Sequence, residues 1–289
     1  MAEFMGTYGS EESCRAAFAA AGWPQGFRCP SCHREQFSAY NRNRQTLWQQ
    51  CCRRCHQTNL IAGTIFEASK SPLTKWRRAM FLMTRSKKSI SAQSLMRHLG
   101  EAYNSACPVK QKMTEVMSEA EEKRELSGRV ESGDAYLSGQ RTGGKIGRST
   151  EGKVPFIAIV QTTEQGHPFY VRLNRMVCLF NSKLQAWGSR FLTAETIAIS
   201  DGLNCFTALT SVIAKHESLI VGSSKQAAQQ PSFRWVNTVI GNLKRALPGT
   251  QHSFQFAKHA WRYLAEYAYR FINRINLRST MSYLITGCA

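Results

Sequence analysis

Two Cys-x-x-Cys pairs constrain the fold of this chain more than any other feature of its sequence. They are Cys29-Pro-Ser-Cys32 and Cys52-Arg-Arg-Cys55, and 19 residues separate them. Each such turn presents two thiolates to one ion, and two turns complete the tetrahedral site that structural zinc takes in proteins. The spacing therefore predicts a zinc ribbon over residues 24–66, with all four cysteines as Zn²⁺ ligands.

Other uses of the ten cysteines are less consistent with the sequence. Cys51 could compete with Cys52 for the metal, but only Cys52 has the Cys-x-x-Cys spacing. A secreted disulfide scaffold is disfavoured, because the polar and acidic start MAEFMGTYGSEES is no secretory signal. Four unrelated reduced cysteines remain an alternative. His33 and His56 follow cysteines directly and are expected at the surface, since four thiolates already satisfy zinc.

The charge of the chain points to a polyanionic partner. There are 38 Lys+Arg against 19 Asp+Glu, a net charge of +19, and residues 14–100 hold 15 of the basic residues but only two acids. Such an excess favours nucleic acid or an anionic membrane. Since no stretch approaches the ~18 apolar residues of a membrane span, we expect no membrane association and a cytoplasmic, nucleoid-associated location.

Changes in composition and in the pattern of apolar residues predict four segments: a helical lead-in (1–23), the zinc ribbon (24–66), a helical DNA-binding segment (67–126) and a larger domain (127–289). Within the third segment, Pro72 precedes a helical pattern, and two further short helices are joined by a turn at Gly100. Helices joined in this way are typical of a helix-turn-helix, although any small helical bundle would have the same pattern.

The last segment alternates strand-like and helical patterns. The strand-like runs are GRVESGDAYLSG, VPFIAIVQT, HPFYVRL, ETIAIS and ESLIVG. The helical patterns that follow the later strands are LNCFTALTSVIAKH, WVNTVIGNLKRAL and KHAWRYLAEYAYRFINRIN. This order predicts an α/β fold in which a mixed sheet is flanked by helices.

Asp134 and Asp201 are the only aspartates in the chain. Asp201 ends a predicted strand, the place where sites are usually built in α/β sheets. Asn237 and Lys244 are seven residues apart on a predicted helix and point the same way. Carboxylates and an amide could hold Mg²⁺ for phosphodiester chemistry, with Lys244 on a phosphate. The alternatives are an ordinary Asp201-Gly202 turn and a solvated helix face.

Several motifs together resemble the bacterial insertion-sequence transposases that join a zinc ribbon to a DDE-type (ISXO2-like), ribonuclease H-like domain. They are FRCPSC, CRRC, AGTIFEASKSPLTKW, LSGRVESGDAYLSG with GGKIGR, VPFIAIVQT, SDGLNCF, WVNTVIGNLKRALPGT and RYLAEYAYRF. The resemblance spans residues 24–275. It implies a ribonuclease H-like fold, binding of duplex DNA at the terminal inverted repeats and the target, and Mg²⁺- or Mn²⁺-dependent strand cleavage and transfer by a homo-oligomer.

The resemblance also implies a catalytic set, with one departure. Asp201, Asn237 and the trailing Lys244 match the family pattern, and Asp134 completes the set as the only acid left of the first pair. The family's ligand position in that pair is Gly133 here. Because neighbouring strand residues point to opposite faces, Asp134 would face away unless a bulge at Gly133 turned it inward.

We therefore expect a DDE transposase whose catalysis is impaired in this copy. The alternative is a non-enzymatic zinc-ribbon DNA-binding protein derived from a transposase, and metal-dependent nicking separates the two. A zinc-ribbon RNA-binding factor is a third alternative, and a preference for single-stranded RNA over duplex DNA would reveal it.

Overall fold

The computed structural model describes residues 9–42, 45–50, 56–85, 88–137, 153–220, 230–247, 250, 256–274 and 284–285. The chain divides into two compact units. Unit 1 comprises Met1–Ser86, Ala92–Val116 and Asn276–Ala289, and unit 2 comprises Lys87–Ser91 and Met117–Ile275. Among the described residues, no helix combines the length and the apolar character needed to cross a bilayer.

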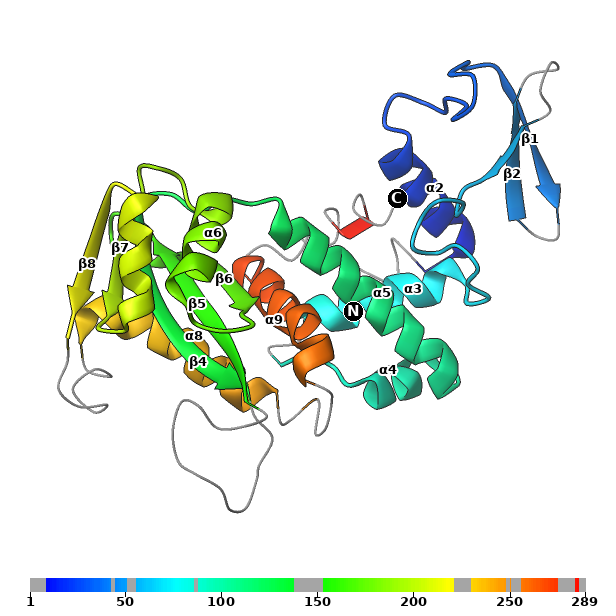
Figure 1. Ribbon diagram of the computed structural model, residues 1–289. Helices are drawn as coiled ribbons and strands as arrows, with labels where there is room; N and C mark the ends of the chain where they lie inside the picture. Colours follow the sequence, from blue (N-terminus) through cyan, green and yellow to red (C-terminus); the bar gives the residue numbers. More distant parts are fainter. Residues whose placement is uncertain are drawn as a thin grey trace. The chain divides into compact units, whose positions relative to one another are not determined.

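Unit 1 combines a small sheet with helices (Figure 1). Strands β1 (Phe37–Arg42), β2 (Gln45–Gln50) and β3 (Gln57–Asn59) pair antiparallel in that order. The helices are α2 (Glu11–Gly22), α3 (Leu73–Arg85), α4 (Ala92–Leu99) and α5 (Tyr103–Glu122), which continues into unit 2. Gly100 separates α4 from α5 with φ +60°, a left-handed conformation that suits glycine. Two helices joined by a turn at Gly100 are therefore present, as predicted, and their role in binding DNA stays a prediction.

The predicted lead-in helix, α2, is part of the core of unit 1. The Glu11 carboxylate accepts the backbone N–H groups of Leu73 (2.9 Å) and Thr74 (3.2 Å), which are free donors at the start of α3. The Phe18 ring packs edge-on against Phe66 with centroids 4.6 Å apart. Contacts between residues more than 45 positions apart in sequence thus dock α2 onto α3 and onto Phe66, which precedes it.

Unit 2 is built on a five-stranded mixed sheet of order β6-β5-β4-β7-β8. The first three strands in sequence, β4 (Arg129–Leu137), β5 (Val154–Thr162) and β6 (Pro168–Arg175), form an antiparallel meander. β7 (Ile197–Asp201) and β8 (Lys215–Leu219) follow in parallel with β4. The first four strands lie where the sequence patterns predict them, and β8 overlaps the predicted fifth strand, ESLIVG, but begins two residues earlier, at Lys215. This mixed five-stranded sheet with flanking helices is the predicted ribonuclease H-like fold.

Helices cover both faces of this sheet (Figure 1). On one face, β4, β5 and β6 pack against α8 (Arg234–Ala246) and α9 (Phe256–Ile272). On the other face, they pack against α6 (Asn181–Phe191) and the 3-10 helix η1 (Asn204–Ser211). A second 3-10 helix, η2 (Pro231–Phe233), leads into α8. Each face therefore carries its own apolar core, and side chains along the strands alternate between the two cores.

The sequence prediction was wrong on one helix of unit 2. The run LNCFTALTSVIAKH was predicted to be helical throughout, but the 3-10 helix ends at Ser211 and Lys215 already begins β8. Parallel pairing with β7 holds this polar edge strand. Lys215 and Glu217 face the same way two residues apart, and their side chains form an ion pair at 2.7 Å.

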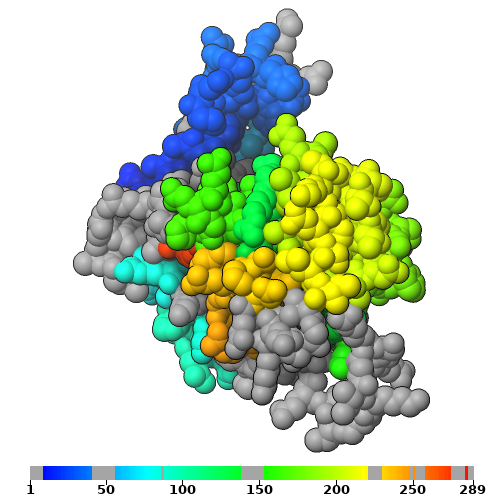
Figure 2. All heavy atoms as spheres, turned by 90° about the vertical axis from the view of Figure 1, so that its left-hand side faces the viewer, coloured from blue at the N-terminus to red at the C-terminus, as the bar shows by residue number. Residues whose placement is uncertain are grey.

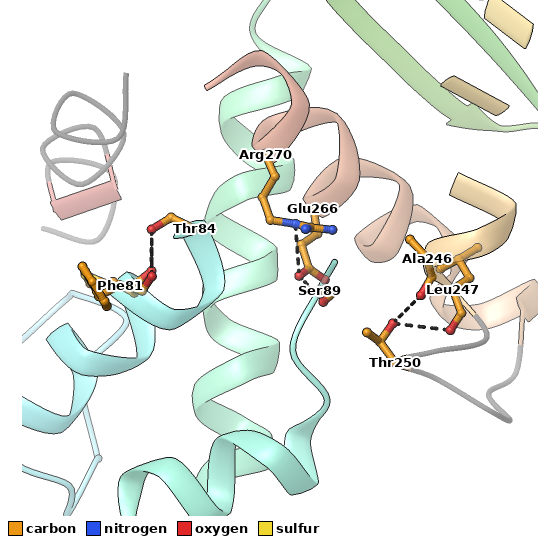
Figure 3. Close-up of polar contacts among 9 residues, drawn as sticks. Phe81, Thr84, Ser89, Ala246, Leu247, Thr250, Glu266 and Arg270 are labelled. Atoms are coloured by element: carbon orange, nitrogen blue, oxygen red, sulfur yellow. Dashed lines mark hydrogen bonds and ion pairs between the residues drawn. The ribbon is translucent and has the colours of Figure 1, made fainter. Parts of the chain in front are cut away.

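Side-chain hydrogen bonds hold α8 and α9 at points away from the sheet (Figure 3). The Ser89 hydroxyl donates to the carboxylate of Glu266 on α9, which also lies 3.7 Å from Nε of Arg270. The Thr250 hydroxyl donates to the carbonyl oxygen of Ala246 at 3.1 Å. The last carbonyl groups of a helix lack N–H partners, so the Thr250 hydroxyl satisfies one of them at the end of α8.

Candidate functional site

The register of β4 decides which face of the sheet each of its residues takes. The β4–β5 ladder is continuous, with Gly133 opposite Ala158 and Asp134 opposite Ile157. Ala158 belongs to the core on the α8 side, and Ile157 belongs to the core on the α6 side. Gly133 therefore faces α8, and the side chain of Asp134 lies on the opposite face of the sheet.

Gly133 lies directly beneath α8. A Cβ atom built on Gly133 would lie 3.2 Å from Cγ2 of Val236 and 3.7 Å from Cδ1 of Ile240. The first of these contacts is tight, so a side chain at this position requires Val236 to move by a few tenths of an ångström. Residue 133 thus projects toward the first turns of α8.

Asp201 ends β7 on the same face as Gly133. It pairs with Leu219 of β8, and both Leu219 and Ile199 pack in the core on the α8 side. The parallel β4–β7 ladder reaches Ser132 and Ser200, so the next residues along the two strands are Gly133 and Asp201. Figure 2, viewed from the β8 side, shows β7–β8 (yellow) beside α8 (gold).

Asp201 can form an ordinary turn and also serve as a metal ligand, because the two interpretations are compatible. Oδ1 of Asp201 accepts the backbone N–H of Leu203 at 3.3 Å, as in an ordinary Asx turn. This contact engages one carboxylate oxygen and orients the side chain at the carboxyl end of β7. The turn therefore positions the carboxylate rather than excluding it from a site.

Asn237 and Lys244 lie on the exposed side of α8. Val236 and Leu243, their immediate neighbours in sequence, are buried against the sheet, whereas Asn237 and Lys244 are exposed. Asn237 follows Val236, the residue that lies over Gly133. The structure thus places residue 133, Asp201 and the Asn237 turn on one face of the sheet, and it places Asp134 on the other.

Glu131 is a residue that the sequence interpretation overlooked. It lies two positions before Gly133, and its Oε2 accepts the backbone N–H groups of Trp235 (2.8 Å) and Val236 (3.0 Å). The residue is 1% exposed. Desolvation raises the pKa of Glu131, while the two N–H bonds act in the opposite direction. Its carboxylate fixes the start of the helix that carries Asn237.

The signal for Glu131 is present in the sequence in retrospect. A carboxylate inside a buried strand needs hydrogen-bonding partners, because burial of an unpaired charge is very costly. Helix α8 needs a cap, because Phe233 at its N-cap position supplies no side-chain hydrogen bond. The Glu131 carboxylate and the uncapped start of α8 satisfy each other, although Glu131 and Trp235 are 104 residues apart in sequence.

Removal of the Glu131 carboxylate is expected to destabilise unit 2. In Glu131→Ala, one buried and one partly buried N–H group lose their acceptor, so we expect a loss of about 2 kcal/mol in the free energy of unfolding. Glu131→Gln keeps an amide oxygen as acceptor and should lose less. Urea denaturation checks this, with the exposed Glu195→Ala as the control. Equal midpoints for Glu131→Ala and Glu195→Ala would contradict the capping role.

The described half of the predicted zinc site has the geometry of a thiolate turn. The backbone N–H of Ser31 donates to Sγ of Cys29 at 3.4 Å, and the N–H of His33 donates to the Cys29 carbonyl oxygen at 2.8 Å. Burial raises the pKa of the Cys29 thiol, but hydrogen bonds from Ser31 and Cys32 outweigh it and the pKa is lowered. A lowered pKa favours the thiolate, the form that binds zinc.

The other half of this site, Cys52 and Cys55, lies outside the described residues, as does Cys51. Within the part of the chain that the structure describes, no three potential ligands gather around one point. The four-cysteine ligand set therefore stays a prediction. His33 and His56 are both exposed, as expected.

Comparison with known proteins agrees with this architecture. A family model described as the ISXO2-like transposase domain matches residues 125–272, more than half of the chain. A model described as the transposase zinc-ribbon domain matches residues 9–58, a range that includes α2. No curated protein matches the chain. The chain thus belongs to the IS1595 family of transposases, with an N-terminal zinc ribbon and an ISXO2-like DDE transposase domain.

Proposed function

We propose that this chain binds the terminal inverted repeats of its insertion sequence and belongs to the machinery that cuts and joins them. Unit 1 provides the grip on duplex DNA through its basic helices. The DDE domain is built for metal-dependent hydrolysis at the element end, followed by strand transfer with the freed 3′-hydroxyl as nucleophile. The family membership, the net charge of +19 and the ribonuclease H-like sheet support this proposal.

The proposed catalytic roles come from the family resemblance, and the position of Asp201 and of the first turns of α8 on one face of the sheet supports them. Asp201 and Asn237 would hold Mg²⁺ or Mn²⁺, whose chemistry is to activate water and to stabilise the leaving oxygen. Lys244, two turns beyond Asn237, would contact the phosphate as a point charge. Glu131 would hold the start of α8 so that Asn237 keeps its place relative to Asp201.

We further propose that cleavage is impaired in this copy. The observation that carries this proposal is the regular β4 ladder, in which Gly133 faces α8 and Asp134 does not. One carboxylate and a neutral amide are a poor site for Mg²⁺, which favours carboxylates in near-ideal octahedral geometry. Use of Asp134 as a ligand would require β4 to shift by one residue. Such a shift displaces the ligand much further than the roughly 0.5 Å that a metal site tolerates.

The test is cleavage of a duplex that carries an element end, in Mg²⁺ and in Mn²⁺. We expect binding without efficient nicking by the parent chain. The rival function, a non-enzymatic zinc-ribbon DNA-binding protein, has the same parent behaviour but stays inactive when Gly133 is replaced by aspartate. A preference for single-stranded RNA over duplex DNA would contradict both.

The basic helices of unit 1 are expected to give salt-dependent DNA binding. Arg85 and Arg97 are exposed near the ends of α3 and α4. Removal of one side chain that neutralises a phosphate should reduce the slope of log K against log salt by about 0.9. We therefore expect Arg85→Glu/Arg97→Glu to bind more weakly and with a shallower slope. The matched control is Lys183→Glu on α6 of unit 2, and equal effects of both changes would contradict the assignment.

The division into segments 1–23, 24–66, 67–126 and 127–289 is also part of this proposal, as is assembly into a homo-oligomer on DNA. The match of the zinc-ribbon family model to residues 9–58 supports one adjustment, in which the lead-in helix and the ribbon are treated as one domain. Sedimentation with and without end-containing duplex tests the assembly.

A further inference from the structure

Unit 2 contains a hollow of about 480 Å³ that the proposed catalytic residues do not line. It lies where β6 begins and α9 ends, and its walls include Arg124, Ser127, Gln161, Phe169, Ile272 and Arg274. Its volume lies within the range of small-molecule sites, roughly 300–1,000 Å³. The hollow is therefore large enough to admit one organic group of moderate size.

The aromatic ring of Phe169 lines this hollow and is exposed to solvent. Phe169 is 63% exposed, although it lies on a strand whose neighbours Tyr170 and Val171 are buried. A phenylalanine in this position loses the free energy of burial unless a partner covers it. Its ring is thus available as a stacking platform.

Two guanidinium groups flank the hollow and are held in place. Cζ of Arg124 lies 5.3 Å from the centroid of the Tyr170 ring, and Cζ of Arg274 lies 4.0 Å from that of Phe271. Arg274 also donates to the carbonyl oxygen of Pro168 at 3.2 Å. A guanidinium carries five N–H donors, so each can still bind an anion. Glu125 contributes one carboxylate to the lining, which leaves a net charge of +1.

We propose that this hollow binds one unpaired nucleotide of a DNA strand. The base would stack on Phe169, the Gln161 amide would meet its edge, and the phosphate would lie between Arg124 and Arg274. An aromatic platform beside cationic side chains is the combination that binds single strands, because every base has a face to stack. Paired bases inside a duplex do not expose that face, so the hollow selects frayed or overhanging ends. The inference rests on the proposed action at DNA ends.

The test compares a blunt element-end duplex with the same duplex carrying a short overhang that contains 2-aminopurine. We expect the parent chain to bind the overhang more tightly and to change the fluorescence of 2-aminopurine by stacking. Phe169→Ala should weaken overhang binding by about 5- to 150-fold, the range for one base–aromatic stack, and remove the fluorescence change. Its affinity for blunt duplex should stay unchanged, and Phe169→Trp should keep the preference.

The matched control is Phe180→Ala, which removes an equally exposed ring (66%) elsewhere on unit 2 and should change nothing. Equal binding of blunt and overhanging duplex by the parent and by Phe169→Ala would overturn the inference. The inference would also be overturned if Phe169→Ala changed only the oligomeric state of the protein, because the Phe169 ring would then contact another protein chain and not DNA. Failure of the parent to bind blunt duplex would instead count against the proposed function, independently of Phe169.

Discussion

The change Gly133→Asp is expected to raise metal-dependent nicking of an element-end duplex by at least about 100-fold over the parent chain. Residue 133 faces α8 on the same side of the sheet as Asp201, so a carboxylate there completes a set of two acids and an amide. Loss of a residue that only orients a metal ligand costs about 10–100-fold, and a whole ligand should exceed that. Gel analysis of strand nicking in Mg²⁺ and Mn²⁺ measures it.

Three matched variants make this experiment specific. Gly133→Asn has nearly the same shape as the aspartate and meets the same 3.2 Å contact with Val236, so it controls for packing without adding charge. Gly133→Asp/Asp201→Ala should lose the new activity. Asp134→Ala should nick the element-end duplex at the same rate as the parent chain. Robust nicking by the parent that disappears in Asp134→Ala would show that Asp134 is the ligand and would refute the impairment.

Local patterns predicted most of the fold of unit 2, because strands such as β5 and β7 are largely apolar runs bounded by turns. Helix α6 was not predicted from the sequence, because its local sequence signals are weak. Phe180 at its N-cap makes no side-chain capping bond, and Gly188 interrupts the pattern. The reason for Gly188 is tertiary, since a Cβ there would lie 2.8 Å from Cδ2 of Leu209 on η1. A glycine chosen for close packing looks like a helix breaker in sequence.

The functional assignment of β4 shows what a sequence can and cannot supply. Strand alternation alone predicted that Gly133 and Asp134 face opposite ways, and the β4–β5 register has this arrangement. The sequence shows that a carboxylate in a buried strand needs partners, but it does not show which N–H groups Glu11 and Glu131 cap, because these partners lie 62 to 105 residues away. Only the folded chain brings a buried carboxylate and an uncapped helix together.

Loss of zinc is expected to unfold the ribbon and leave unit 2 folded. Apparent zinc-binding free energies of structural sites are about 10–16 kcal/mol, and a segment of ~40 residues buries too little core to fold without that contribution. In Cys32→Ser we therefore expect no bound zinc and rapid amide exchange over residues 24–66. Exchange within β4 and β5 should match that of the parent. Metal analysis with hydrogen-exchange mass spectrometry measures both.

Two cysteine controls separate a ligand from a thiol that only packs. Cys178→Ser removes a half-buried cysteine without a Cys-x-x-Cys partner and should keep one zinc per chain. Cys51→Ser should also keep it, whereas Cys52→Ser should lose it, because only Cys52 has the spacing that turns two thiolates toward one ion. Reduced parent protein without zinc would refute the ribbon site. Unfolding of unit 2 along with the ribbon would instead show that the two units fold cooperatively, contrary to this expectation.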